Sequence, residues 1–233
     1  MRKKISVAMA VYNGQRYLKE QVDSILCQLM PEDEIVVSID PSTDRSLEIL
    51  ESYQDSRVRI VEGPGQGVLS NFENAILHTK NEIVFLCDQD DVWVNNKVVE
   101  VLACFQEGVS VVVHDAMVTD ANLQVEEDSF FKLRHSKPGF FKNVWKNSYI
   151  GCCMAFCRDL IEDICPFPKK LPMHDQWIGL MAEKKGKSVF LDKPLIYYRR
   201  HETNVSNRQH ANLWQMLKWR LQILVALQRR VKR

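Results

Sequence analysis

The sequence predicts a single α/β domain with a mostly parallel central sheet that helices cover on both faces. Short apolar segments alternate with segments whose apolar residues recur at helical spacing, which is typical of strand–helix–strand units. Polar clusters follow the apolar segments directly, at the carboxyl edge where open α/β sheets bind ligands. With 233 residues, of which 45% are hydrophobic, the chain is long and apolar enough to form one substantial core.

Four strand–helix units are expected in the first half of the chain. The strands are expected at 5–11, 34–40, 57–62 and 82–87. Each is followed by a turn or loop and then by a segment with apolar residues at helical spacing. These residues are Leu18, Val22, Ile25, Leu29, Leu47, Leu50, Leu69, Phe72, Ile76, Val98, Val101, Leu102 and Phe105. Ser42 or Thr43 is expected to cap the second helix, which directs Leu47 and Leu50 inward.

Three carboxylates stand directly after the fourth strand, at Asp88, Asp90 and Asp91. Carboxylates that crowd at a strand end repel one another and resist desolvation, so they require a cation, hydrogen bonds or solvent. Mg²⁺ and Mn²⁺ prefer such oxygen ligands and leave coordination positions for phosphate oxygens. We therefore hypothesise a divalent metal that carries a diphosphate. The alternative is a solvated acidic turn at the start of the next helix.

Two further polar clusters follow earlier strand ends. Tyr12-Asn13-Gly14 follows the first strand, and Asp40 follows the second. A parallel sheet brings both clusters to the same edge as the three carboxylates. This convergence favours a functional site over a solvated turn.

The regular alternation ends in the second half of the chain. Further strands are expected at 110–113, 149–156, 189–191 and 195–198. Within the second of these, Gly151 and Cys152 are small residues that leave room for a ligand or another backbone. The prolines of 166–172 predict a stiff, extended loop.

Two polar motifs in this half have both a structural and a functional interpretation. Asp175 stands where a helix is expected to begin, and Asp is a common N-cap residue. A lone His in a loop, such as His201, is usually structural or solvated. However, Arg199 and Arg200 directly before it could donate bidentate hydrogen bonds to a diphosphate. The residues alone leave these alternatives open.

The charge of the chain is nearly balanced but unevenly distributed. A net charge of +1 gives no reason to expect a nucleic-acid partner. From 199 to 233, nine Lys or Arg residues stand against the single acid Glu202. The segment 213–233 predicts a basic amphipathic helix, which fits an anionic membrane face, its own domain or a partner. No apolar stretch is long enough to span a membrane, and the first apolar run is a strand rather than a signal peptide.

The seven cysteines are an odd number without a repeated spacing. This usage predicts a reducing compartment rather than a disulfide framework. Cys152, Cys153, Cys157 and Cys165 form no paired C-x-x-C elements, so a zinc site is not expected there.

Taken together, these motifs resemble those of the family 2 inverting glycosyltransferases with the GT-A fold, in particular a bacterial rhamnosyltransferase-like branch. The resemblance extends from Val7 to Val205. Asp88-Gln89-Asp90-Asp91-Val92-Trp93 resembles the family's D-x-D element. His174-Asp175-Gln176-Trp177 resembles the H-D-W-W box of that branch. Tyr198-Arg199-Arg200-His201 with Asn204-Val205 resembles its Y-R-Q-H-x-x-N-V ending.

The resemblance implies a role for each matching position. Asp175 falls at the position of the catalytic base. The positions implied to hold the divalent metal, Mn²⁺ or Mg²⁺, are Asp88, Asp90 and His201. Those implied to bind the nucleotide are Tyr12, Asn13, Asp40 and Asp88, with Arg199 and Arg200 at the diphosphate. Those implied to line the donor or acceptor pocket are Asp91, Trp93, Gly151, Cys152, His174 and Trp177.

The resemblance also implies a domain organisation. A GT-A domain at 1–205 would combine a nucleotide-sugar-binding half at 1–113 with an acceptor-side half at 114–205, and a basic amphipathic helix would follow at 206–233. Three positions depart from the family pattern. Ile39 and Pro41 flank Asp40 where the family often has D-D-G-S, which leaves the nucleotide open, and Gln176 replaces the first Trp of H-D-W-W, which leaves the sugar open.

The function implied is inverting, metal-dependent transfer of a sugar from a dTDP or UDP donor to a hydroxyl of a lipid-linked or polymeric glycan in surface polysaccharide synthesis. The resembling branch suggests L-rhamnose as the sugar. We expect a cytoplasmic protein that contacts the inner face of the cell membrane through 211–233. The alternative is a non-catalytic nucleotide-sugar-binding subunit of a polysaccharide assembly complex. A nucleotidyltransferase would require a glycine-rich basic loop after the first strand, and 12–16 supply only a fragment of one.

Overall fold

The computed structural model describes residues 2–202 and 212–231. Asn204 and Val205 of the expected C-terminal motif, and parts of the segments 206–233 and 211–233, lie outside the described residues. The strands are β1 Ile5–Val11, β2 Glu34–Ile39, β3 Val58–Glu62, β4 Ile83–Cys87, β5 Val92–Trp93, β6 Val109–Thr119, β7 Val125–Glu127, β8 Met154–Cys157 and β9 Lys187–Arg199. The α-helices are α1 Leu18–Leu26, α2 Ser46–Glu51, α3 Val68–Leu77, α4 Lys97–Ala103, α5 Phe130–Arg134, α6 Phe140–Trp145, α7 Ile161–Ile164, α8 His174–Lys185 and α9 Leu213–Val231. Two short 3₁₀ turns are η1 Gly151–Cys153 and η2 Arg158–Leu160.

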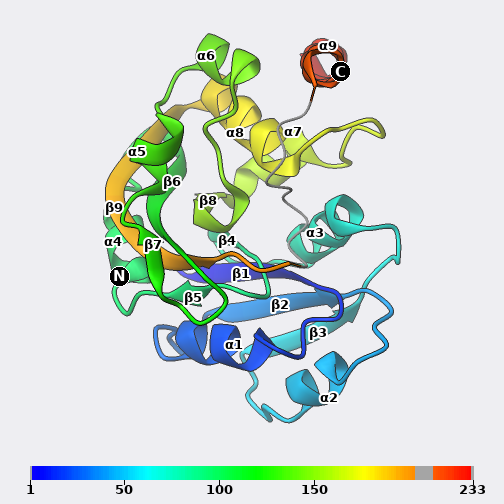
Figure 1. Ribbon diagram of the computed structural model, residues 1–233, viewed down its shortest axis with the longest axis vertical. Coiled ribbons are helices and arrows are strands. Elements are labelled where there is room, and N and C mark those ends of the chain that lie inside the picture. Colours follow the sequence, from blue (N-terminus) through cyan, green and yellow to red (C-terminus); the bar gives the residue numbers. More distant parts are fainter. Residues whose placement is uncertain (1, 203–211, 232–233) are drawn as a thin grey trace.

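The strands form one nine-stranded sheet in the order β3-β2-β1-β4-β8-β6-β9-β5, with β7 paired to β6. The first four strands pair in parallel, and β6 pairs in parallel with β9. Antiparallel pairing of β8 with β4 and β6 joins the two parts of the sheet (Figure 1). The predicted α/β class with a mostly parallel central sheet is confirmed, and antiparallel strands are inserted in its second half.

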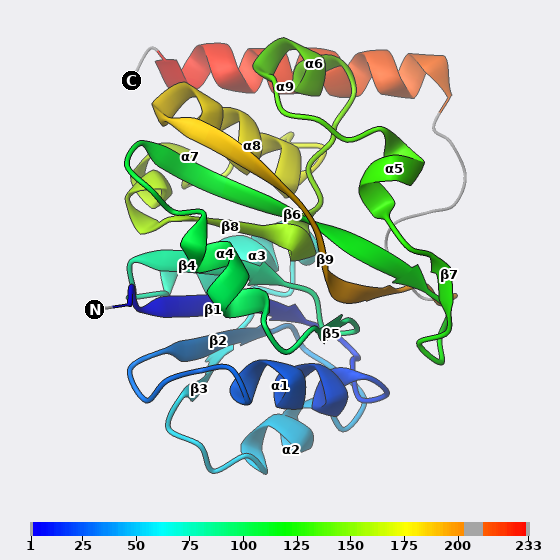
Figure 2. The same cartoon turned by 90° about the vertical axis from the view of Figure 1, so that its left-hand side faces the viewer.

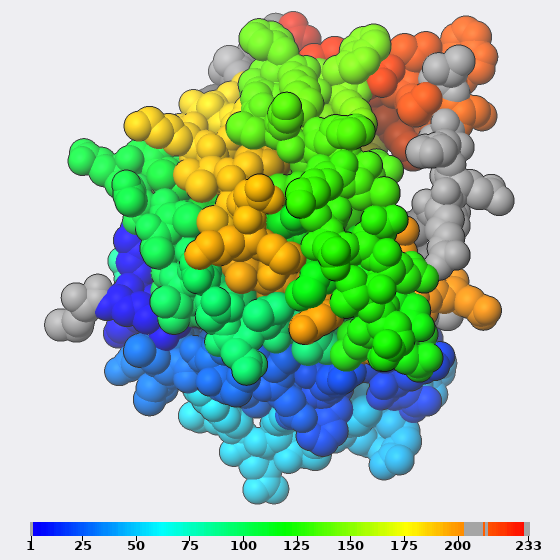
Figure 3. Space-filling model, turned by 60° about the vertical axis from the view of Figure 1, so that its left-hand side comes forward, coloured from blue at the N-terminus to red at the C-terminus, as the bar shows by residue number. Residues whose placement is uncertain are grey.

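Helices cover the sheet on both sides in the first half of the chain. Every residue of β1 and β4 is buried, as expected for interior strands of a parallel sheet. α1 and α2 lie on one side of β1, β2 and β3, and α3 lies on the other (Figure 2). The predicted inward residues Val22 of α1 and Phe72 of α3 are fully buried. In the space-filling view, the blue and cyan residues of this half adjoin the green to orange residues of the second half (Figure 3).

The start of α2 differs from the prediction. The helix begins at Ser46 rather than after Ser42 or Thr43, and Asp44 accepts hydrogen bonds from the backbone N–H and the hydroxyl of Ser46. Leu50 is buried as expected, whereas Leu47 is 44% exposed. The Ser42 hydroxyl instead accepts a hydrogen bond from the Asn13 N–H, which fixes the loop after β1.

Two strands of the second half also differ from the prediction. The segment expected as a strand at 149–156 forms the turn η1 first, and only Met154–Cys157 is a strand. The strands expected at 189–191 and 195–198 are one continuous strand, β9. Its pairing with β6 shifts register around Asp115, opposite Pro194, so the strand continues through the polar interruption.

The C-terminal helix α9 packs on its own domain, which was one of the alternatives open at the sequence level. Its residues Ile223, Ala226 and Leu227 are buried. Arg230 donates hydrogen bonds to the backbone carbonyls of Asp163 and Pro166, at 2.6 and 3.0 Å. Among the described residues, no helix has the length and apolarity needed to cross a membrane.

Candidate active site

Contacts with the end of β9 fix the acidic loop between β4 and β5. Asp91 accepts a hydrogen bond from the backbone N–H of Arg199 at 3.0 Å. The Arg199 guanidinium donates to the backbone carbonyls of Asp90 and Ala121, at 2.8 and 2.7 Å, and forms an ion pair with Glu20. The side chain of Arg199 is almost completely buried by these contacts. Arg199 therefore fixes the acidic loop, and its guanidinium is engaged with protein groups rather than pointing freely at the position expected for a diphosphate.

The side chains of Asp90, in this loop, and His201 contact each other. The His201 Nε2 lies 2.8 Å from an oxygen of the Asp90 carboxylate, and the His201 ring packs against Tyr17 at 4.8 Å between ring centres. Burial raises the pKa of Asp90, and His201 opposes the rise. The structure thus brings together two of the three residues that the resemblance implied as metal ligands.

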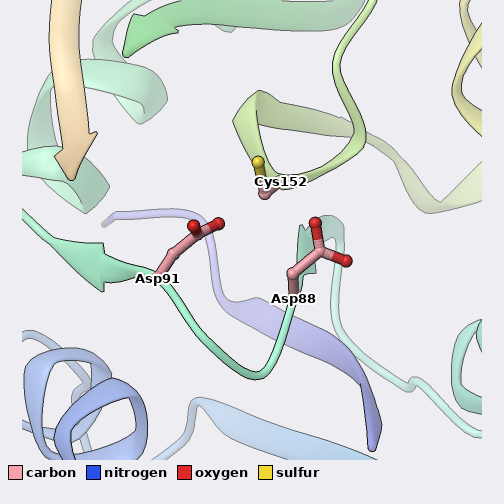
Figure 4. A group of neighbouring side chains, drawn as sticks. All are labelled: Asp88, Asp91 and Cys152. Carbon is pink, nitrogen blue, oxygen red and sulfur yellow. The ribbon is translucent and has the colours of Figure 1, made fainter. Parts of the chain in front are cut away.

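Asp88, the third of these residues, lies in a second group with Asp91 and Cys152 (Figure 4). One ligand atom of each residue lies within 4.8 Å of the others, which is close enough to hold a metal ion. Burial raises the pKa of Asp88 to about 7, and the charges of Asp90 and Asp175 add to the rise. Burial and the two neighbouring carboxylates also raise the pKa of Asp91, which is 1% exposed, well above its ordinary value.

The donor set of this loop fits a divalent cation. Carboxylates whose pKa values are raised by burial and by one another are destabilised when ionised, and a cation removes that destabilisation. The carboxylates of Asp88 and Asp91 supply the oxygen ligands that hard divalent cations prefer, whereas the third member of the group, Cys152, supplies a thiol.

Lys97 lies beneath the acidic loop and was not singled out from the sequence. It is fully buried at the start of α4, and its ammonium donates a hydrogen bond to the Cys152 carbonyl at 2.9 Å. The ammonium also lies 4.0 Å from the centre of the Trp93 ring. Burial lowers the pKa of Lys97. A single Lys on the apolar face that carries Val101 was the sequence signal for a buried ammonium.

The nucleotide-side residues reach the same edge of the sheet as the acidic loop. Gln89, in the middle of the loop, donates to the Tyr12 carbonyl at 3.0 Å and accepts from the Tyr12 N–H at 2.8 Å. Asn13 adopts a positive φ of 48°, and its side chain accepts a hydrogen bond from the Thr43 N–H. Asp40 is buried and accepts a hydrogen bond from the Gly65 N–H at 2.8 Å. Gln89 therefore links the acidic loop to Tyr12. The sequence predicted that these two clusters share one edge of the sheet, but it did not predict a contact between them.

Asp175 lies in the first turn of α8, near enough to the acidic loop for its charge to act on Asp88. The N-cap position belongs to Met173, so the N-cap interpretation of Asp175 is wrong. Its carboxylate accepts hydrogen bonds from the side chain of Asn147 at 3.2 Å and from the Gln176 N–H at 2.5 Å. Burial raises the pKa of Asp175 to about 6, although these hydrogen bonds oppose the rise. Because the charge of Asp175 in turn raises the pKa of Asp88, the two carboxylates share one electrostatic environment.

His174 and Gly151 contact each other beside Asp175. The His174 ring stacks on Phe72 with 4.3 Å between ring centres, and burial lowers its pKa to about 4. A Cβ added to Gly151 would lie 2.9 Å from the His174 Nε2. The absence of a side chain at Gly151 therefore lets η1 approach the neutral imidazole closely.

The two tryptophans expected in the pocket are core residues. Trp93 is buried between Phe85 and the Lys97 ammonium. Trp177 is fully buried, and its indole N–H donates to the Ile164 carbonyl at 3.0 Å. Each ring therefore supports an element that carries a site residue, and neither ring is exposed to a ligand. The backbone N–H of Arg200 donates to the Thr119 carbonyl at 2.8 Å, and its side chain is half-buried.

The mostly parallel sheet with the acidic loop at its carboxyl edge is the architecture of a glycosyltransferase domain of the GT-A fold. Residues 6–165 match glycosyl transferase family 2, and the chain therefore belongs to this family. The predicted recognition, fold class and class of enzyme are thereby confirmed.

The chain is similar to several bacterial glycosyltransferases. It is 27% identical over 219 residues to the dTDP-rhamnosyl transferase RfbG of Shigella flexneri, an alignment that covers 84% of this chain and 72% of RfbG. It is 34% identical over 231 residues to the glycosyltransferase GlyG of Streptococcus pneumoniae, which covers 90% of this chain and 75% of GlyG.

Solved structures share the fold of the chain. The S. aureus TarS fragment 1–349 in complex with UDP-GlcNAc is 23% identical, with a TM-score of 0.71 over 96% of this chain and 67% of that fragment. The mannosyltransferase PcManGT of Pyrobaculum calidifontis, in complex with GDP-Man and Mn²⁺, is 19% identical, with a TM-score of 0.62 over 97% of this chain and 62% of that protein. The chain thus spans about two thirds of these two solved chains.

Proposed function

We propose that the chain catalyses inverting, metal-dependent transfer of a sugar from a nucleoside-diphosphate donor to a hydroxyl of a lipid-linked or polymeric glycan in bacterial surface polysaccharide synthesis. The observation that carries the proposal is the group of Asp88, Asp91 and Cys152 at the carboxyl edge of the sheet, in a chain that belongs to glycosyl transferase family 2. The charge of Asp175 adds to the rise in the pKa of Asp88, which places Asp175 near this group. A base on one side of the transferred sugar and a diphosphate-binding loop on the other is the arrangement that inversion requires.

Asp175 is the proposed general base. Its pKa of about 6 leaves it ionised at neutral pH but more basic than an ordinary carboxylate. The carboxylate takes the proton of the acceptor hydroxyl while that oxygen bonds to the anomeric carbon, and the bond from this carbon to the diphosphate breaks. The hydrogen bond from Asn147 holds the Asp175 side chain in place for this step.

Asp90, His201 and Asp88 are the proposed ligands of the divalent metal, Mn²⁺ or Mg²⁺. When bound, the metal would stabilise the charge that develops on the leaving diphosphate. Asp91 keeps the hydrogen bond that it accepts from the backbone N–H of Arg199, and this bond stabilises the conformation of the acidic loop. Arg200, which is half-buried, is the proposed cationic contact of the diphosphate.

The nucleotide is proposed to bind against Tyr12, Asn13 and Asp40, within the half 1–113, and the acceptor against the half 114–205. Similarity to RfbG, a dTDP-rhamnosyl transferase, supports dTDP-L-rhamnose as the first donor to test. The fold shared with TarS, whose structure holds UDP-GlcNAc, supports UDP sugars as the second. Gly151 and His174 are the proposed contacts of the sugar or acceptor, whereas the Cys152 side chain is buried beside Asp88 and Asp91.

We also propose that the protein is cytoplasmic and contacts the inner face of the cell membrane through 211–233. A lipid-linked acceptor is held at such a surface, so peripheral contact would bring enzyme and acceptor together. The basic residues of this segment, among them Lys218 and Arg229, support the proposal because anionic lipids attract them.

A donor screen followed by a transfer assay tests the proposed reaction. The matching nucleotide sugar is expected to raise the melting temperature only with Mn²⁺ or Mg²⁺ present, and the Asp90→Ala variant is expected to lose this response. Transfer to a lipid-linked acceptor should then follow with the same donor. Donor binding without turnover against any acceptor would instead support a non-catalytic nucleotide-sugar-binding subunit.

A further inference from the structure

One face of α9 leaves a row of apolar side chains exposed. Trp214 is 82% exposed and Leu221 is 64% exposed, with Leu217 and Leu224 at the intervening turns. Their spacing of three and four positions places them on one side of the helix. Ile223, Ala226 and Leu227 are buried on the other side. Packing on the domain therefore uses one face of the helix and leaves this row uncovered.

The short helix α6 adds two exposed aromatic residues beside this row. Phe141 is 87% exposed and Trp145 is 65% exposed. The Arg220 guanidinium lies 3.9 Å from the centre of the Trp145 ring and donates to the Trp145 carbonyl at 2.9 Å. Because Arg220 directly precedes Leu221, this contact brings α6 to the edge of the exposed row. Both helices lie at the same end of the molecule (Figures 1 and 2).

The sequence segments that contain these two helices carry basic but no acidic residues. The segment 129–158, which contains α6, has six Lys or Arg residues and no Asp or Glu. The segment 203–233 has seven Lys or Arg residues and no Asp or Glu. Exposed Trp and Leu side chains with basic neighbours fit an anionic phospholipid surface, where the rings enter the interface and the cations meet lipid phosphates.

We propose that α6 and α9 form one composite face that docks on anionic phospholipid. The composite face consists of Phe141, Trp145, Trp214, Leu217, Leu221 and Leu224. The inference rests on the proposed membrane contact of 211–233, and it adds a second helix and an orientation. α1 and α2 lie at the opposite end of the molecule (Figure 2), so the docked protein turns its second half toward the lipid and its nucleotide side toward the cytosol.

Vesicle cosedimentation of the full chain with a variant of α6 tests the composite face. The wild type is expected to bind vesicles of phosphatidylcholine with phosphatidylglycerol and to bind pure phosphatidylcholine weakly. Phe141→Ser with Trp145→Ser should weaken binding to the anionic vesicles by about tenfold or more, although α9 is intact. Leu77→Ser with Val99→Ser is the matched control, because these side chains are also exposed but lie on α3 and α4. The control should bind as the wild type does.

The outcomes separate this inference from the proposed membrane contact. Equal binding by the wild type and the α6 variant would overturn the composite face while leaving α9 as the contact. No binding by the wild type would overturn both. A wild-type dimer that the α6 substitutions dissociate, without vesicle binding, would assign the face to a second copy of the chain and overturn the lipid proposal. Circular dichroism of each variant confirms that the fold is intact.

Discussion

Asp175→Asn is expected to stabilise the folded protein at neutral pH although it removes the proposed base. Burial raises the pKa of Asp175 from 3.8 to about 6. Between these two values the folded chain keeps a proton that the unfolded chain has lost, so the stability contributed by this group falls as the pH rises through that window. The difference between the two pKa values corresponds to about 3 kcal/mol.

Asn keeps the shape of Asp and an oxygen that can accept the hydrogen bonds from Asn147 and Gln176, but it carries no charge to desolvate. We therefore expect the free energy of unfolding to exceed that of the wild type by about 1.5 kcal/mol at pH 5 and by about 3 kcal/mol at pH 8. Urea unfolding in metal-free buffer measures both values.

Asp192→Asn, at an exposed position of β9, is the matched control and should show no such pH dependence. An Asp175→Asn variant that is no more stable than the wild type at pH 8 would refute the assignment of a desolvated carboxylate at this position.

Further expectations concern the other groups of the site. The value of kcat/KM should fall as the pH drops below about 6, because the proposed base becomes protonated. Lys97→Met removes a charge that lowers the pKa of Asp88, so the pH below which Mn²⁺ binding is lost, measured by calorimetry, should rise. An unchanged pH dependence of Mn²⁺ binding would contradict this. Gly151→Ala should cost about 1–3 kcal/mol in urea unfolding and slow transfer, because its Cβ meets His174, which stacks on Phe72. Gly179→Ala, which meets the Tyr149 ring, should lower stability with little effect on transfer.

The first half of the fold could be predicted because each strand and helix there follows its own hydrophobic pattern. β1 and β4 are continuous apolar runs that end in polar residues, so both their burial and their ligand-binding edge follow from the sequence. β9 was predicted as two strands because Asp192, Lys193 and Pro194 interrupt its apolar pattern. The continuous strand depends on a shifted register with β6, which only the folded sheet reveals.

The sequence predicted which carboxylates gather at this edge of the sheet, but not the residues that position them. Lys97 and Gln89 act through contacts with residues distant in the sequence, Cys152 and Tyr12, and no local pattern predicts those contacts. Trp93, at the end of the acidic motif 88–93, was predicted to line the donor or acceptor pocket. Trp93 instead packs in the core, since a large ring next to a strand end stabilises the loop by burial.

The most direct test of the central claim is the rate of sugar transfer by Asp175→Asn. If Asp175 is the base opposite the acidic loop, the folded variant should bind the donor with unchanged affinity while kcat falls by about 10²–10⁴-fold. Asp192→Asn, measured alongside, should transfer at the wild-type rate. Substantial transfer by Asp175→Asn would show that another group takes the acceptor proton and would contradict the proposed mechanism.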